Sequence, residues 1–118
     1  MPTKKILTKD SINSIQEPKA VELNIPEWNG SVYVRVMVAA DRDAMGYAVE
    51  QARKSKKSIS GIMVAHSLSD ENGNRIYTDE EGESILSKKS NKALDRIIRF
   101  SNKLNLVGDD EVQTAVKN

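Results

Sequence analysis

The chain has no cysteine, so disulfide bonds and thiolate chemistry are excluded. Aromatic side chains are scarce, with one Trp, one Phe and three Tyr among 118 residues, and we therefore expect an aliphatic core. The only histidine, His66, cannot form a metal site built from several histidines. No nucleophile accompanies it in a local motif, so we expect His66 to be a packed or surface residue of a helix.

Catalytic fingerprints are also absent. The sequence contains no nucleophile elbow, no phosphate-binding loop and no dinucleotide-binding fingerprint. Each of these motifs places a reactive group or a cradle of backbone amides at a fixed spacing, and no such spacing occurs here. We therefore predict that the protein is not an enzyme and that it has no catalytic residues, no metal ligands and no cofactor.

Long hydrophobic runs are missing too. No stretch has the roughly 20 apolar residues that a membrane-spanning helix needs. The first residues, Met1 to Lys5, are not followed by an apolar run long enough for a signal peptide. We expect a cytoplasmic protein with no membrane partner, folded as one domain over residues 1–118, with flexible ends at residues 1–7 and 115–118.

Charge is abundant, and its near balance hides a block pattern. The net charge is +1, from 18 basic and 17 acidic residues. Residues 53–57 hold four bases and no acid, whereas residues 70–83 hold six acids and one base, a net charge of −5. Residues 88–103 hold six bases and one acid, a net charge of +5. Such blocks suit contact between copies of the chain, or they are solvated helix faces that complement helix dipoles.

Nucleic acid is the partner that basic blocks first suggest. A nucleic-acid-binding domain typically combines an excess of positive charge with aromatic side chains that stack on bases. Here the total charge is close to zero and aromatic residues are few. The composition therefore disfavours nucleic-acid binding, which we keep only as an alternative function.

The clearest periodic pattern lies in residues 20–38. Apolar and polar residues alternate on both sides of Asn29-Gly30, a dipeptide that tolerates the positive φ of a tight turn. The alternating apolar positions are Val21, Leu23, Ile25, Val32, Val34, Val36 and Val38. This period of two predicts a β-hairpin with these side chains on the covered face. Tyr33, Arg35 and Met37 then lie on the other face.

Helical patterns account for most of the remaining chain. Capping residues (Thr8, Thr78 and Ser90), acidic first turns and apolar stripes predict helices over residues 9–16, 39–53, 59–68, 79–86 and 91–105, and a short one from Asp109. Gly46, inside the second of these, is compatible with close packing of another element. We therefore predict a mostly α-helical α+β domain. In it, an antiparallel β-hairpin at about 20–38 packs on four to five helices and is covered by helices 59–68 and 91–105.

One segment partly matches a calcium-binding loop. The residues at positions 1, 3, 5, 9 and 12 of that template are Asp70, Asn72, Asn74, Thr78 and Glu81. The sixth position, however, needs Gly and holds Arg75, and the eighth holds Tyr77 instead of an aliphatic residue. Glu81 also completes a capping box with Thr78. We therefore predict a turn followed by a helix, with calcium binding as the alternative.

The order of these pieces resembles a known family. The likeness is carried by the run from Pro26 to Arg35, by Ala40-Asp41-Arg42-Asp43-Ala44 at a helix start, by the run from Val64 to Glu80, and by Ala93-Leu94-Asp95-Arg96 and Leu104-Asn105. It spans nearly the whole chain and resembles the tail assembly chaperones of bacteriophages with long, non-contractile tails. Asn29 stands where the family usually has Gly, and Tyr77 where it usually has Phe.

The resemblance implies a non-enzymatic morphogenesis factor. Such a protein binds the tape measure protein, keeps its long helices soluble and helps recruit the tail tube protein. It acts in the host cell cytoplasm and is absent from the mature virion. The resemblance also implies a mostly helical protein that forms a homo-oligomer, as a ring or a spiral. The alternative is a structural tail-completion or connector subunit that is retained in the virion.

Candidate contact residues follow from the hairpin and from the methionines. Trp28 at the hairpin tip either packs back on a helix or anchors a partner, because Trp is favoured at interface hot spots. The outer hairpin face and the flexible, polarisable methionines suit adaptable apolar contacts. The candidate partner-binding or self-association residues are Trp28, Tyr33, Arg35, Met37, Met45 and Met63.

Overall fold

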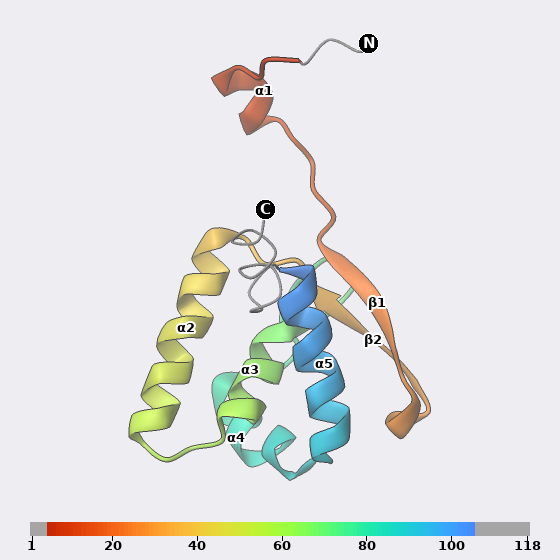
Figure 1. The fold of residues 1–118 in the computed structure, drawn as a ribbon, viewed down its shortest axis with the longest axis vertical. Coiled ribbons are helices and arrows are strands. Elements are labelled where there is room, and N and C mark those ends of the chain that lie inside the picture. Colours follow the sequence, from red (N-terminus) through yellow and green to blue (C-terminus); the bar gives the residue numbers. More distant parts are fainter. Residues whose placement is uncertain (1–4, 106–118) are drawn as a thin grey trace, which may run out of the picture.

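The computed structural model describes residues 5–105. The elements along the chain are α1 (Lys9–Asn13), β1 (Ala20–Ile25), the 3-10 turn η1 (Pro26–Trp28), β2 (Gly30–Arg35), α2 (Ala39–Lys54), α3 (Ile59–Ser67), β3 (Leu68–Ser69), α4 (Asp79–Ser84), the 3-10 turn η2 (Leu86–Lys88) and α5 (Asn91–Leu104). This is the predicted mostly helical α+β domain (Figure 1). The predicted helix from Asp109 lies outside the described residues.

The hairpin forms as predicted but ends earlier. β1 and β2 pair antiparallel from Ala20 opposite Arg35 to Ile25 opposite Gly30. Asn29 makes the reversal with φ 59 and ψ 39, the left-handed conformation that Asn tolerates. The strand stops at Arg35, and Val38 already serves as the N-cap residue of α2. The assignment of Val38 to the covered face was therefore wrong, since this residue is 63% exposed.

A third strand completes the sheet. The predicted helix 59–68 ends at Ser67, and Leu68 and Ser69 pair with Val34 and Tyr33 of β2. The strand order is β1-β2-β3, so β2 is central and β1 forms an edge. Sequence patterning missed β3 because a two-residue strand has no measurable periodicity.

The core lies between the sheet and two helices. α5 stands between α3 and the β1–β2 hairpin (Figure 1), and its apolar stripe faces inward as predicted. The buried cluster comprises Ile25, Val34, Val64, Ala65, Leu68, Leu86, Ala93, Leu94 and Ile97. None of these side chains is aromatic, which confirms the expectation of an aliphatic core. No helix within residues 5–105 has the length and apolarity to cross a membrane.

Two glycines let α3 and α4 touch through their backbones. A Cβ on Gly82 would lie 2.7 Å from the carbonyl oxygen of Gly61, and a Cβ on Gly61 would collide with the carbonyl oxygen of Gly82. Any larger residue must push the helices apart. Gly46 plays no such role, because a Cβ there would meet no atom within 4 Å. The suggestion of close packing at Gly46 was therefore wrong, and the close approach occurs at Gly61 instead.

A bidentate ion pair fastens the hairpin tip to α5. The Arg96 guanidinium donates to both carboxylate oxygens of Glu27, at 2.9 and 2.8 Å. This hydrogen bond is the main reason that the pKa of Glu27 falls from its ordinary value of 4.5 to about 2. Trp28, the next residue, is half-buried against the core. The hairpin tip is thus held to the domain by the Glu27–Arg96 ion pair and by the packing of Trp28.

Candidate functional site: an apolar arm and the groove at its root

The N-terminal segment stands away from the domain body (Figure 1). Its helix, α1, is shorter than the predicted 9–16 and ends at Asn13. A capping box starts it: the Thr8 amide donates to Ser11 Oγ at 2.7 Å, and the Ser11 amide donates to Thr8 Oγ1 at 3.2 Å. These bonds define the first turn without help from the rest of the domain. Residues 6–15 are called the arm below.

The arm exposes an unusual share of the apolar surface. Four of the eight large hydrophobic side chains that are exposed within residues 5–105 belong to it. They are Ile6 at 84%, Leu7 at 47%, Ile12 at 54% and Ile15 at 48% exposure. Leu7 and Ile12 occupy the two positions of a hydrophobic staple around the Thr8 cap, and Ile15 follows just after the helix, where its amide donates to the Ile12 carbonyl at 3.2 Å. Within residues 5–105, the arm therefore leaves four aliphatic side chains exposed, one of them inside α1.

The root of the arm is clamped between two parts of the body. The Val36 amide donates to the Lys19 carbonyl at 2.9 Å, which extends the hairpin pairing by one bond. On the other side, Gly73 has a φ of +83, and a Cβ there would lie 2.8 Å from the Lys19 carbonyl oxygen. Only glycine fits this position without strain. The arm therefore leaves the body in a defined direction.

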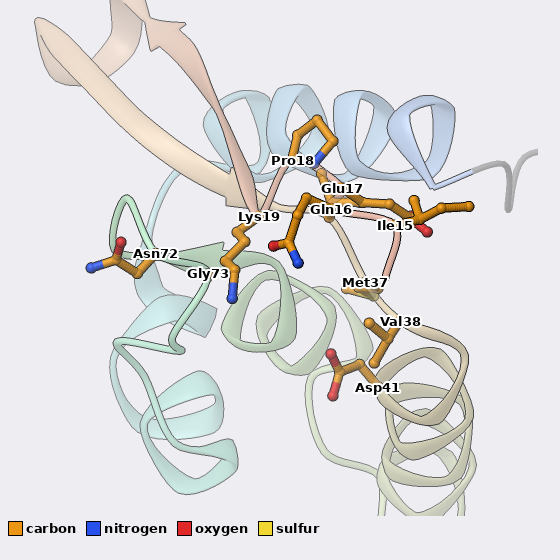
Figure 2. A pocket seen from close by; sticks show the side chains of 11 residues that line it. Ile15, Gln16, Glu17, Pro18, Lys19, Met37, Val38, Asp41, Asn72 and Gly73 are labelled. Carbon is orange, nitrogen blue, oxygen red and sulfur yellow. The ribbon is translucent and has the colours of Figure 1, made fainter. Parts of the chain in front are cut away.

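A groove of about 350 Å³ lies at this root (Figure 2). Its walls come from the end of the arm, from the β2–α2 connection and from the 70–74 turn. Met37 lines it, and the Met37 amide is held by Asn105 Oδ1 at 2.8 Å. Asn105 in turn donates to the Arg35 carbonyl at 3.2 Å, so the groove wall is tied to the end of α5. Arm and groove together form a continuous candidate contact surface that includes one of the predicted residues.

The other candidate contact residues have different positions. Trp28, Tyr33 and Met63 are half-buried, and Trp28 packs against the core. Met45 is only 6% exposed, on the buried side of α2. Met45 therefore cannot contact a partner in this structure, and its selection as a surface candidate is corrected. Sequence reasoning predicted the helix of the arm but did not select its side chains as contact residues, although three isoleucines around a capping box ahead of Pro18 were the available signal.

Arg35 also lies inside the domain, contrary to the expected outer face. It is 6% exposed because β3 and the end of α3 cover that face of β2. Its Nε donates to the His66 carbonyl at 2.5 Å, and its Nη1 lies 3.1 Å from Asp41 Oδ2. Burial lowers the pKa of Arg35 and Asp41 opposes that shift, but an arginine remains charged. Arg35 thus stabilises the end of α3 and offers no partner contact.

A second arginine completes the cap of α3. Arg75 Nε donates to the Ala65 carbonyl at 3.1 Å, and its Nη2 donates to Asp79 Oδ1 at 2.8 Å. Positive charge at a helix C-terminus is favourable because the last carbonyls carry the negative end of the helix dipole. Asp79 sits in the first turn of α4, where a negative charge is equally favourable. The cluster therefore joins the C-terminus of α3 to the N-terminus of α4.

His66 is buried beside this cluster. It is 4% exposed, and its Nε2 lies 2.8 Å from Asp79 Oδ1 without the alignment of a hydrogen bond. Nδ1 also lacks a hydrogen-bond partner among the described residues. Burial, and then the nearby Arg75 charge, lower the pKa of His66, while Asp79 opposes the shift. The imidazole is therefore neutral at pH 7, as a packed histidine of a helix.

The proposed calcium ligands have other structural roles. The Asp70 carboxylate accepts hydrogen bonds from the amides of Asn72 at 2.8 Å and Asn74 at 3.0 Å, which lower the pKa of Asp70. Glu81 accepts from the Thr78 amide at 2.9 Å in the predicted capping box. Within residues 5–105, no group of three or more His, Cys, Asp or Glu side chains could hold a metal ion. This segment forms the predicted turn and cap.

Comparisons of the chain with protein-family models, with curated proteins and with solved structures find no match. The resemblance to tail assembly chaperones therefore rests on the order and spacing of the sequence motifs described above.

Proposed function

We propose that this chain is a non-enzymatic tail morphogenesis factor of a bacteriophage with a long, non-contractile tail. It binds the tape measure protein, keeps that protein soluble in the host cytoplasm and helps recruit the tail tube protein. The motif order supports the family. The observation that carries the binding role is the arm, with four exposed aliphatic side chains on a segment that stands away from the body.

The physical basis is helix pairing between the arm and an apolar face of the tape measure protein. The capping box orders the first turn before contact, so less conformational entropy is lost on binding. Ile12, inside α1, and Ile15, just past its end, supply exposed aliphatic side chains for this contact. Met37 in the root groove adds a flexible, polarisable side chain that adapts to different aliphatic partners.

Co-expression with a tape measure fragment tests the proposal. We expect the wild-type chain to keep the fragment in the supernatant and to co-purify with it. A variant with Ile6→Ser, Leu7→Ser, Ile12→Ser and Ile15→Ser should fold normally, because these side chains are exposed, and should lose most of the co-purified fragment. The matched control is Tyr47→Ser, which removes a side chain that is 70% exposed on α2 and should bind normally. A fragment left insoluble and unbound by the wild-type chain refutes the proposal.

The same arm suits a permanent contact in a finished particle, which is the second candidate function. A tail-completion or connector subunit remains in the virion, whereas an assembly chaperone leaves. Quantitative mass spectrometry of purified virions distinguishes the two. We expect the chain to be absent from the particles and abundant in the lysate; stoichiometric amounts in the particles favour the structural subunit.

A further inference from the structure

The sequence contains two Asn-Gly pairs, Asn29-Gly30 and Asn72-Gly73, and both asparagines are exposed. In such a pair, the backbone nitrogen of glycine can attack the side-chain carbonyl carbon of asparagine, because glycine has no Cβ to obstruct the approach. The new C–N bond closes a five-membered succinimide ring, and ammonia leaves with the proton that the glycine nitrogen has lost. Water then opens the ring at either carbonyl. The product is aspartate or isoaspartate, and no oxidant, reductant or cofactor takes part.

The structure protects Asn29-Gly30 against this reaction. Asn29 is the left-handed residue of the hairpin reversal, and Gly30 pairs with Ile25, which is fully buried. The reversal joins two strands of six residues each, and the bidentate bonds from Arg96 to Glu27 fix it to α5. Moving the Gly30 nitrogen onto the Asn29 side chain would break the end of the strand pairing. We therefore expect Asn29 to react slowly.

Asn72-Gly73 lies in an exposed turn, where short-range hydrogen bonds hold it. The Asn72 amide donates to Asp70 Oδ1 at 2.8 Å, and the Gly73 amide donates to the Asp70 carbonyl at 3.1 Å. The Asn72 side chain points away from the root groove (Figure 2) and makes no hydrogen bond among residues 5–105. Breaking the bond from the Gly73 amide, a local opening of an exposed turn, therefore frees the attacking nitrogen.

We propose that Asn72-Gly73 is a self-modification site, whose conversion to isoaspartate releases the clamp at the root of the arm. Isoaspartate carries the main chain through its side-chain carbons and so adds one methylene group to the backbone. The turn has no room for this addition, because a Cβ on Gly73 would already lie 2.8 Å from the Lys19 carbonyl oxygen. The longer backbone therefore displaces Gly73 from Lys19. The reaction requires no tape measure protein and is independent of what the arm binds.

The conversion also changes the charge beside the clamp. It replaces a neutral amide by a carboxylate, next to exposed Glu71 and within residues 70–83, whose net charge is already −5. Asn72 and Gly73 line the root groove, so the added charge and the longer backbone both alter one wall of that groove. Fresh and aged molecules of the same chain therefore differ at the place where the arm leaves the body.

Ageing of the full chain in mildly alkaline buffer tests the reaction, because the glycine nitrogen attacks after it loses its proton. Peptide mapping with isoaspartyl methyltransferase labelling follows each asparagine separately. We expect isoaspartate to accumulate at Asn72 several-fold faster than at Asn29, and more slowly in mildly acidic buffer. Asn72→Gln is the matched variant and should not be labelled there, because its longer side chain would have to close a six-membered ring. An Asn72 that stays intact, or an Asn29 that reacts as fast, overturns the proposal.

Amide hydrogen exchange tests the release of the clamp. The reporter is the Val36 amide, which donates to the Lys19 carbonyl at 2.9 Å. This amide should exchange several-fold faster in the aged wild-type chain than in the fresh one, whereas the aged Asn72→Gln chain should keep its protection. The fresh Asn72→Asp chain has the new carboxylate without the extra methylene, so it should show only a small part of the increase.

Two outcomes of the exchange experiment contradict the release of the clamp by a longer backbone. Isoaspartate at Asn72 with unchanged exchange at Val36 shows that the clamp survives the reaction. Equal acceleration in the fresh Asn72→Asp chain assigns the release to charge alone. Circular dichroism confirms in each case that the chain is folded.

Discussion

Two short helices in this protein begin in the same way and end in different environments. α1 and α4 have five and six residues, and each starts with a threonine in a capping box. α4 presses Gly82 against Gly61 of α3, places Asp79 against Arg75 and packs against α3 and η2. α1 extends away from the body and leaves Ile12, and Ile15 just past its end, exposed. A capping box therefore determines where a helix begins, while the contacts of its remaining side chains determine whether the fold depends on it.

The largest effect should come from breaking the backbone contact of α4. Ala at Gly61 or Gly82 must separate two helices that leave no room for a Cβ at either glycine, and we expect each variant to lose about 2 kcal/mol or more of unfolding free energy. Urea unfolding followed by circular dichroism measures this loss. The matched control is Gly46→Ala, which enters open space on α2 and should raise stability by up to ~1 kcal/mol. Equal stability of Gly61→Ala and Gly46→Ala would falsify the backbone crossing.

The two N-cap threonines, Thr78 and Thr8, should differ in how much they contribute to the free energy of unfolding, and both contributions should be smaller than the effect of the glycine variants. Thr78→Ala removes the N-cap of a helix that packs on the core, and it should lower the unfolding free energy by about 1 kcal/mol. Thr8→Ala removes the equivalent cap from the arm and should leave global unfolding within about 0.5 kcal/mol of the wild type. The same urea titrations compare both variants. A large loss in Thr8→Ala would mean that the arm packs on the body in solution.

The free energy of unfolding should depend on pH through His66, which is buried in the last turn of α3. Because the folded-state pKa of His66 lies below its unfolded value of about 6.5, the unfolded chain binds more protons in weak acid. Stability is then fully present above pH 6.5 and declines as the pH falls below that value. Replacing His66 with Gln should flatten this decline between pH 7 and pH 5. An unchanged slope in that variant would assign the decline to other groups.

The smallest effect should appear in stronger acid, at the hairpin tip. Glu27 has a folded-state pKa of about 2, below its ordinary value of 4.5, so its contribution to stability is present above pH 4.5 and is lost as the pH falls toward 2. Glu27→Gln should remove part of the acid sensitivity in that range. Asp10→Asn on the arm is the control and should leave the acid unfolding curve unchanged. A curve for Glu27→Gln that matches the wild type would show that the ion pair with Arg96 contributes little.

Local signals predicted much of the fold. The alternation around Asn29-Gly30 predicted the hairpin, and Thr8, Thr78 and Ser90 were predicted as the caps that begin three helices. Each signal lies within a few residues of the element it specifies. Such local signals do not show which faces of different helices and strands pack against each other. The burial of Arg35, for example, depends on β3, which follows it by more than thirty residues.

The candidate site was less predictable for the same reason. Met37 was selected for its flexibility and lines the groove, whereas Met45 was selected for the same property and is buried. Composition cannot separate these two cases, because exposure depends on what packs against each residue. For the charge blocks, too, composition could not separate the residues that have partners within the chain from those that stay exposed. Among the six acids of residues 70–83, four have partners within the chain and Glu71 and Glu80 remain exposed; the four are Asp70, Asp79, Glu81 and Glu83.

The position of β1 at the edge of the sheet has a consequence for aggregation. An open edge strand invites pairing with the edges of other molecules, the first step toward amyloid-like stacks. Here Pro18 precedes β1 and Pro26 follows it, and neither residue has an amide hydrogen to donate. Exposed Glu22 and Asn24 lie between them, so a growing stack would bring carboxylates together. The charged and proline-flanked edge strand thereby protects the sheet against uncontrolled edge-to-edge polymerisation.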